Sequence, residues 1–336
     1  MCYHQDKRSS SERIVYKLMT DSNSTVNTTK QCKNRISLYL VLFGIIGVIL
    51  AVFMAYCQVN HTHTAQIGNG EILRFSHNGA EDTSFARIIT YFEDSAAVTV
   101  LTVCTVLAIL ISLIVPAFTI PTQDLKAENS NSICTVFASS LLGFIFAGYV
   151  VNYLITPLRP LWTSVTLPGP DYSSMSHMLK IIYYAGIAAA IPCAIYFLLI
   201  ATQNRFIPGT NMCILSVSPV IFLALRLIFY FMSTSAHVNT SGRKLYIISM
   251  VLAIIFFIQD SKRWIPDSDG KNEAKHSKLF FASGFASIVT FAAYHLSTTY
   301  LQIYWILRPE DSYLLNGIFI SMILFIMFRI ASFRKA

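Results

Sequence analysis

A few polar residues stand inside long apolar runs, and they are the strongest candidates for chemistry in this sequence. Arg226 shares a helical face with Tyr230, because a spacing of four residues places two side chains on one side of a helix. Asn152 and His295 lie at a similar depth in two other apolar runs. If these helices meet, Arg226, Asn152, His295 and Tyr230 line a small polar pocket that opens to the outside.

Three interpretations of Arg226 are open at this point. A buried arginine is costly in a membrane unless it is paired, so Arg226 could bind an anion or act as a gating charge. Its long side chain could instead lift the guanidinium toward the membrane surface. The third interpretation is a structural hydrogen bond to the carbonyl groups of a broken neighbouring helix. Asn152 and His295 also have an ordinary interpretation, because such side chains commonly join membrane helices.

Three prolines fall inside the apolar runs, namely Pro116, Pro192 and Pro219. Proline removes a backbone donor and tends to kink a helix, which frees carbonyl groups that must find other partners. We therefore predict a helix kink at each of these residues. Such kinks can form cavities or hinges, and they are also routine in membrane bundles.

The sequence lacks the usual signatures of metal sites and enzymes. His61 and His63 are spaced to lie on one side of a strand, but no acidic residue or cysteine accompanies them at a regular spacing. They are weak metal candidates, and we expect no metal and no cofactor. The HExxH, GxSxG and P-loop motifs are absent. No Asp or Glu lies in a predicted span, which argues against a carboxylate proton relay.

Long apolar runs must position these residues. Of the 336 residues, 54% are hydrophobic and 12% are charged, whereas about a quarter of a soluble domain is charged. About 20 mostly apolar residues carry a helix across a bilayer. We predict an all-α membrane bundle of about eight transmembrane helices, or seven if the sixth does not cross. The predicted spans are 36–57, 96–120, 133–155, 181–201, 213–233, 245–258, 279–307 and 313–333.

Basic residues gather in alternate gaps between these spans. The two terminal tails and every second gap hold 17 Lys and Arg residues, and the opposite gaps hold 7. Because cytoplasmic loops of membrane proteins are enriched in Lys and Arg, we predict that both termini are cytoplasmic. The membrane explains the net charge of +8, so no nucleic-acid partner is expected.

The chain divides into a polar tail and one membrane domain. Residues 1–35 form a basic cytoplasmic tail. Within this tail, Ser9 and Glu12 have the spacing of a capping box, which favours one short helix. Residues 36–333 form the polytopic transmembrane domain.

Residues 58–95 are the longest polar stretch between spans, and we place them outside as a loop. Near the end of this loop, apolar residues recur at helical spacing. This pattern predicts an amphipathic helix on the membrane surface just before the second span. The residues that carry the pattern are Phe85, Ile88, Ile89 and Phe92.

One stretch of the chain has a recognisable pattern. It consists of Ser218-Pro219-Val220, Leu225-Arg226-Leu227, Arg243-Lys244-Leu245-Tyr246 and Phe256-Phe257. Over about 40 residues, this pattern resembles uncharacterised multi-pass membrane proteins of anaerobic Gram-positive bacteria. The resemblance implies a bacterial cytoplasmic membrane and a family without an assigned activity.

These observations favour a non-catalytic membrane component, which means a sensor, an assembly factor or an accessory subunit. The alternative is a permease for a small solute or an anion, with Arg226 in the outward-facing pocket. An enzyme embedded in the membrane is the third class, but no facing pair of proton-transfer groups can be placed for it. The expected partner is the lipid bilayer, together with another membrane protein or further copies of the chain.

Overall fold

Eight helices in the described part of the chain are long and apolar enough to cross a membrane. The structure is a computed structural model. It describes residues 34–57, 60, 62–68, 71–75, 87–92, 96–120, 125–127, 132–155, 177–203, 209–233, 241–265, 278–303 and 313–335. The predicted number of spans is confirmed by length and composition. The sixth span, which was in question, is the apolar helix Lys244–Ser261.

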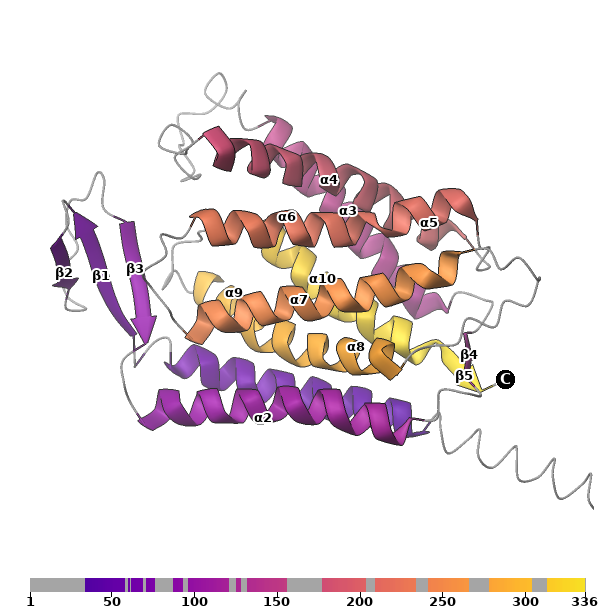
Figure 1. The fold of residues 1–336 in the computed structure, drawn as a ribbon, viewed down its shortest axis with the longest axis horizontal. Helices are drawn as coiled ribbons and strands as arrows, with labels where there is room; N and C mark the ends of the chain where they lie inside the picture. Colours follow the sequence, from indigo (N-terminus) through magenta and orange to yellow (C-terminus); the bar gives the residue numbers. More distant parts are fainter. Residues whose placement is uncertain are drawn as a thin grey trace, which may run out of the picture.

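The described residues are nearly all helical, and Figure 1 shows the long helices running side by side. The first helix, Asn34–Cys57, carries no label in Figure 1. The other helices are α2 (Ala96–Thr119), α3 (Ile133–Ile155), α4 (His177–Thr202), α5 (Thr210–Ser216), α6 (Ser218–Ser233), α7 (Ser241–Ser261), η3 (Lys262–Trp264), α8 (Lys278–Phe291), η4 (Ala292–Leu296), α9 (Ser297–Ile303) and α10 (Tyr313–Ala331).

Helix α8 lies at the centre of the bundle, where it packs against α2, α7 and α10. In the span that contains α8, 83% of the residues in an apolar stretch of 18 are buried, whereas the corresponding share in α2 is 22%. Every α8 residue from Phe280 to Phe291 is buried. Helix α2 instead exposes large apolar side chains such as Val103, Leu110 and Phe118, which suits contact with lipid.

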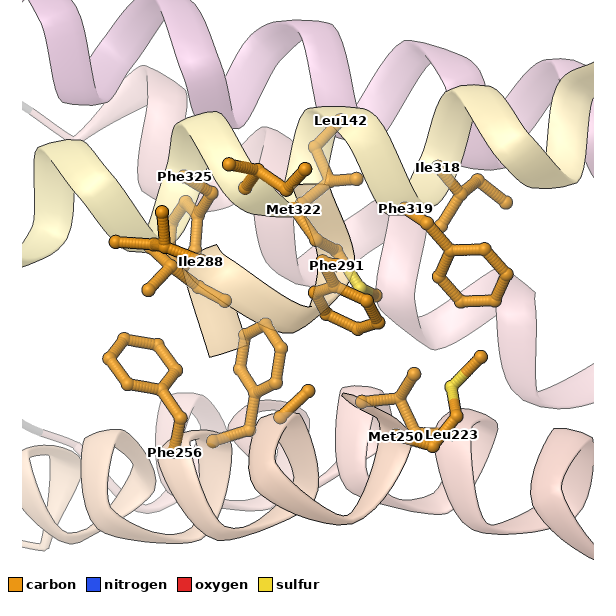
Figure 2. Packing of buried hydrophobic residues seen from close by; sticks show 14 of the residues in the cluster. Leu142, Leu223, Met250, Phe256, Ile288, Phe291, Ile318, Phe319, Met322 and Phe325 are labelled. Atoms are coloured by element: carbon orange, nitrogen blue, oxygen red, sulfur yellow. The ribbon is translucent and has the colours of Figure 1, made fainter. Parts of the chain in front are cut away.

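The core around α8 consists of interlocking apolar side chains. Figure 2 shows Ile288 and Phe291 of α8 between Met322 and Phe325 of α10 and Phe256 of α7. All five side chains are fully buried. Their packing fills the middle of the bundle, because close contact between side chains is what holds helices together in lipid.

Phe197 of α4 extends this core toward the neighbouring helices. Its ring stacks on Phe146 of α3 with the centroids 5.8 Å apart. It also meets Phe325 of α10 edge-on at 5.0 Å and Phe257 of α7 at 6.2 Å. One aromatic side chain therefore contacts three other helices.

The fifth span is broken at Val217, between α5 and α6. Pro219 is the second residue of α6 and stands directly after this irregular turn, within the apolar helix Thr210–Met232. Pro116 and Pro192 do lie inside α2 and α4. The Ser216 and Ser218 hydroxyls donate to carbonyl oxygens of α5 at 2.7 Å.

In the described parts of the chain, five short strands lie at the two ends of the bundle. Strands β1 (Thr62–Gly68), β2 (Glu71–Phe75) and β3 (Arg87–Phe92) form an antiparallel sheet in the order β2-β1-β3. Figure 1 shows this sheet at one end of the bundle and the C-terminus at the other. There, β5 (Phe333–Lys335) pairs with β4 (Leu125–Ala127).

The predicted amphipathic helix before α2 is wrong for residues 87–92, which form strand β3. Five of these six residues are β-branched or aromatic, and such residues favour strands. Their short apolar run fits a strand as well as a helix, and pairing with β1 decides between the two. Phe85 and the predicted helix of the N-terminal tail lie outside the described residues.

Candidate functional site

His295 lies in the π-helical turn η4, which interrupts the central span. Such turns insert an extra residue into a helix and frequently occur at functional sites. The imidazole is only 1% exposed, and its Nδ1 lies 3.3 Å from Oδ1 of Asn316 on α10. Because an amide oxygen can only accept, Nδ1 carries the proton and Nε2 is an acceptor.

Aromatic rings surround His295. Phe319 stacks on the imidazole with the centroids 4.2 Å apart, and Tyr294 lies at 5.0 Å. The rings of Phe291 and Tyr246 lie at 5.3 Å and 5.8 Å. The buried Nε2 has no hydrogen-bond partner among the described residues. We call this group the His295 cluster; it comprises His295, Asn316, Tyr246, Tyr294, Phe291 and Phe319.

Two of the four predicted pocket residues are connected to each other. The ring of Tyr230 on α6 lies 4.3 Å from that of Tyr246, which contacts His295. Arg226 is 6% exposed, and its guanidinium carbon lies 5.1 Å from the centre of the Phe229 ring. Asn152 is half-buried on α3. Tyr230 and His295 thus belong to one chain of ring contacts.

A buried ion pair joins α7 to α10. Nε of Arg329 donates to Oδ1 of Asp260 at 2.9 Å, and the two side chains are 2% and 1% exposed. Both residues belong to apolar helices that could cross a membrane. This corrects the expectation that no carboxylate lies within a span.

The sequence prediction missed this pair because it ended the sixth span at residue 258. It also counted Arg329 with the basic residues of the C-terminal tail, although Arg329 lies within the predicted span 313–333. The available signal was a pair of opposite charges. Asp260 and Arg329 stand near the ends of two predicted spans that run in the same direction across the membrane. Opposite charges at one depth favour each other in a low-dielectric environment.

Two aromatic side chains complete the surroundings of the ion pair. The guanidinium carbon of Arg329 lies 6.0 Å from the Trp264 ring centre. Nε1 of Trp264 donates to the hydroxyl oxygen of Tyr196 at 3.1 Å. We call Asp260, Arg329, Trp264 and Tyr196 the Asp260 cluster. It joins α4, α7, η3 and α10 at the end of the bundle that carries β5.

The two clusters lie toward opposite ends of the same pair of helices. Helix α7 provides Tyr246 and Asp260, and helix α10 provides Asn316 and Arg329. At the rise of an α-helix, these positions are about 20 Å apart along each helix. The apolar layer of Figure 2, including Phe256 and Phe325, comes from the stretches between them.

The hydroxyl groups of α8 are satisfied within their own helix. Ser283 donates to the Leu279 carbonyl oxygen at 2.6 Å, and Ser287 donates to that of Ser283 at 2.7 Å. Thr290 donates to the Ala286 carbonyl oxygen at 2.8 Å. The three hydroxyls therefore turn back onto the backbone and leave the contacts with neighbouring helices to apolar side chains.

The predicted metal candidates gain no support from the described residues. His61 lies outside them, and only the backbone of His63 is described, opposite Tyr91 in the pairing of β1 with β3. No group of three or more His, Cys, Asp and Glu residues that could hold a metal occurs in the described part of the chain. No protein-family model, curated protein or solved structure matches this chain.

Proposed function

We propose that this chain is a non-catalytic integral membrane component, namely a sensor or an accessory subunit of a bacterial cytoplasmic membrane. The observation that carries the proposal is the packing around α8. Phe280 to Phe291 of this central helix are buried without a gap. A carrier or channel must offer polar groups or water at the middle of the membrane, and apolar side chains surround this stretch of α8 instead.

The small sheet supports the same function. Strands β1, β2 and β3 form the connection between the first helix and α2, at the end of the bundle opposite the chain terminus. Both edge strands of this sheet, β2 and β3, have one side without a neighbouring strand among those described. Edge strands present backbone donors and acceptors to other chains, so the sheet is suited to contact a second protein.

The experiment is isolation of the protein with its neighbours from its native membrane. Cells are treated with a cross-linker, and the full chain is purified in lipid nanodiscs. We expect one partner protein in fixed stoichiometry with the wild type. We expect that partner to be lost when residues 62–92 are replaced by a Gly-Ser linker of equal length. A monodisperse protein without a partner in both preparations would contradict the proposal.

A permease is the second candidate, and the buried His295 and Asn316 pair favours it. A buried polar pair in a membrane helix bundle frequently marks the path of a solute. Purified protein in proteoliposomes would then carry a small polar solute or an anion. We expect His295→Leu and Arg226→Leu to reduce the flux at least tenfold. The exposed Arg35, replaced by Leu, is the matched control and should leave the flux unchanged. An equal flux in all four proteins would remove both residues from transport.

A further inference from the structure

We propose that the Asp260 and Arg329 ion pair is a releasable latch between α7 and α10. The pair closes the end of the bundle that carries the C-terminus. When the two charged side chains separate, the Asp260 end of α7 can move away from α10. The contact itself is specific, because Nε of Arg329 donates to a carboxylate oxygen of Asp260 at 2.9 Å with both side chains buried.

The chemical nature of the pair indicates release rather than permanent closure. Two charges lose their hydration when they are buried together, and well-packed apolar residues often hold an interface as well or better. An apolar contact gains nothing in return when it opens, because its side chains are not hydrated favourably. Separated charges at the end of a bundle instead regain hydration, which offsets part of the lost attraction. An ion pair at this place therefore closes the bundle and can still open.

The position of the pair defines which elements move. Asp260 is followed directly by the short helix η3, whose Trp264 lies against Arg329 and donates to Tyr196. The other end of α7 is held by Tyr246, which contacts Tyr230 and Phe319. Helix α7 stays fixed at Tyr246 while its Asp260 end and η3 swing together, a movement that also breaks the hydrogen bond from Trp264 to Tyr196.

Helix α5 provides a natural reporter of this movement. It packs against both η3 and α7, and its Cys213 is half-buried. We expect the movement of η3 away from α5 to expose this helix, and with it the Cys213 thiol, to water. The rate at which a water-soluble maleimide labels Cys213 therefore measures how often the latch is open.

The experiment uses the full chain in lipid nanodiscs, in which both membrane faces are accessible. Cys213 is left as the sole cysteine after replacement of Cys2, Cys32, Cys57, Cys104, Cys134 and Cys193 by Ala. We expect Asp260→Asn and Arg329→Gln each to raise the labelling rate about tenfold or more, the change that the loss of one such contact produces. The double variant Asp260→Leu with Arg329→Met should be labelled more slowly than the wild type.

Two further variants keep the test decisive. The charge-exchanged double variant, Asp260→Arg with Arg329→Asp, restores an ion pair and should bring the rate back toward the wild type. Lys262→Gln removes a neighbouring cation that contacts Gln259 at 3.1 Å, and it should leave the rate unchanged. Equal labelling of all variants that elute as monodisperse protein would overturn the latch. Faster labelling of Cys213 in the double variant Asp260→Leu with Arg329→Met than in the wild type would also overturn the latch. Neither result depends on a partner protein or on transport.

Discussion

The indole Nε1 of Trp264 donates a hydrogen bond to the hydroxyl oxygen of Tyr196 at 3.1 Å, and both side chains are buried. The two residues are 68 positions apart in the chain, and their rings meet edge-on with the centroids 6.2 Å apart. This contact attaches the short helix η3 to α4. In the closed bundle it holds the start of the connection between α7 and the central helix α8 against α4.

The first prediction concerns this hydrogen bond. Tyr196→Phe and Trp264→Phe should each lower stability, and a double-mutant cycle should give a coupling energy of about 0.5–1.5 kcal/mol, the usual net value of one hydrogen bond. Unfolding in mixed detergent and SDS micelles measures the free energies. If the effects of the two substitutions on the free energy of unfolding add within about 0.5 kcal/mol, Tyr196 and Trp264 do not stabilise the protein through this contact.

The second prediction concerns the His295 cluster. Asn316→Leu removes the acceptor of the buried Nδ1, so this variant should lose about 1–3 kcal/mol. His295→Phe combined with Asn316→Leu should be more stable than Asn316→Leu alone, because neither polar partner then remains buried. The same SDS unfolding measurement tests both variants. A double variant that is less stable than Asn316→Leu would show that the imidazole makes other essential contacts.

The membrane spans could be predicted from the sequence because length and apolar composition alone decide them. The sixth span illustrates the limit of that reasoning. The sequence prediction ended it at residue 258, where the apolar run gives way to Gln259 and Asp260. The helix continues to Ser261 because Arg329 on a distant part of the chain neutralises Asp260. A helix end that depends on a partner 69 positions away has no local signal.

The candidate site was predictable only in part for the same reason. Polarity within an apolar run was enough to single out His295 and Arg226. Tyr246 and Asn316 escaped notice because tyrosine and asparagine near span ends are ordinary residues in membrane proteins. Their role depends on α7, η4 and α10 lying next to one another, and helical spacing within one segment carries no information about neighbouring helices.

The third prediction concerns topology. An even number of crossings places both ends of a chain on the same side, and eight candidate spans meet this condition in the described residues. The excess of Lys and Arg predicts that this side is the cytoplasm. Tags at the two ends should therefore both be inaccessible to protease in intact cells and both become accessible after lysis. A tag at residue 70, between β1 and β2, should be cleaved without lysis. Opposite results for the two terminal tags would contradict eight crossings.

The fourth prediction uses two glycines to test the packing of the central helix. A Cβ atom on Gly284 of α8 would lie 2.6 Å from Cδ1 of Ile330 and 3.1 Å from a ring carbon of Phe256, whereas one on Gly148 of α3 would meet nothing within 4 Å. The Phe256 ring has little freedom to yield, because it packs on Phe280 at 4.8 Å. Gly284→Ala should therefore lose about 1–3 kcal/mol through overpacking. Gly148→Ala should gain up to about 1 kcal/mol, since alanine favours the helix. Equal stabilities in SDS unfolding would mean that α8 is less tightly enclosed than its burial indicates.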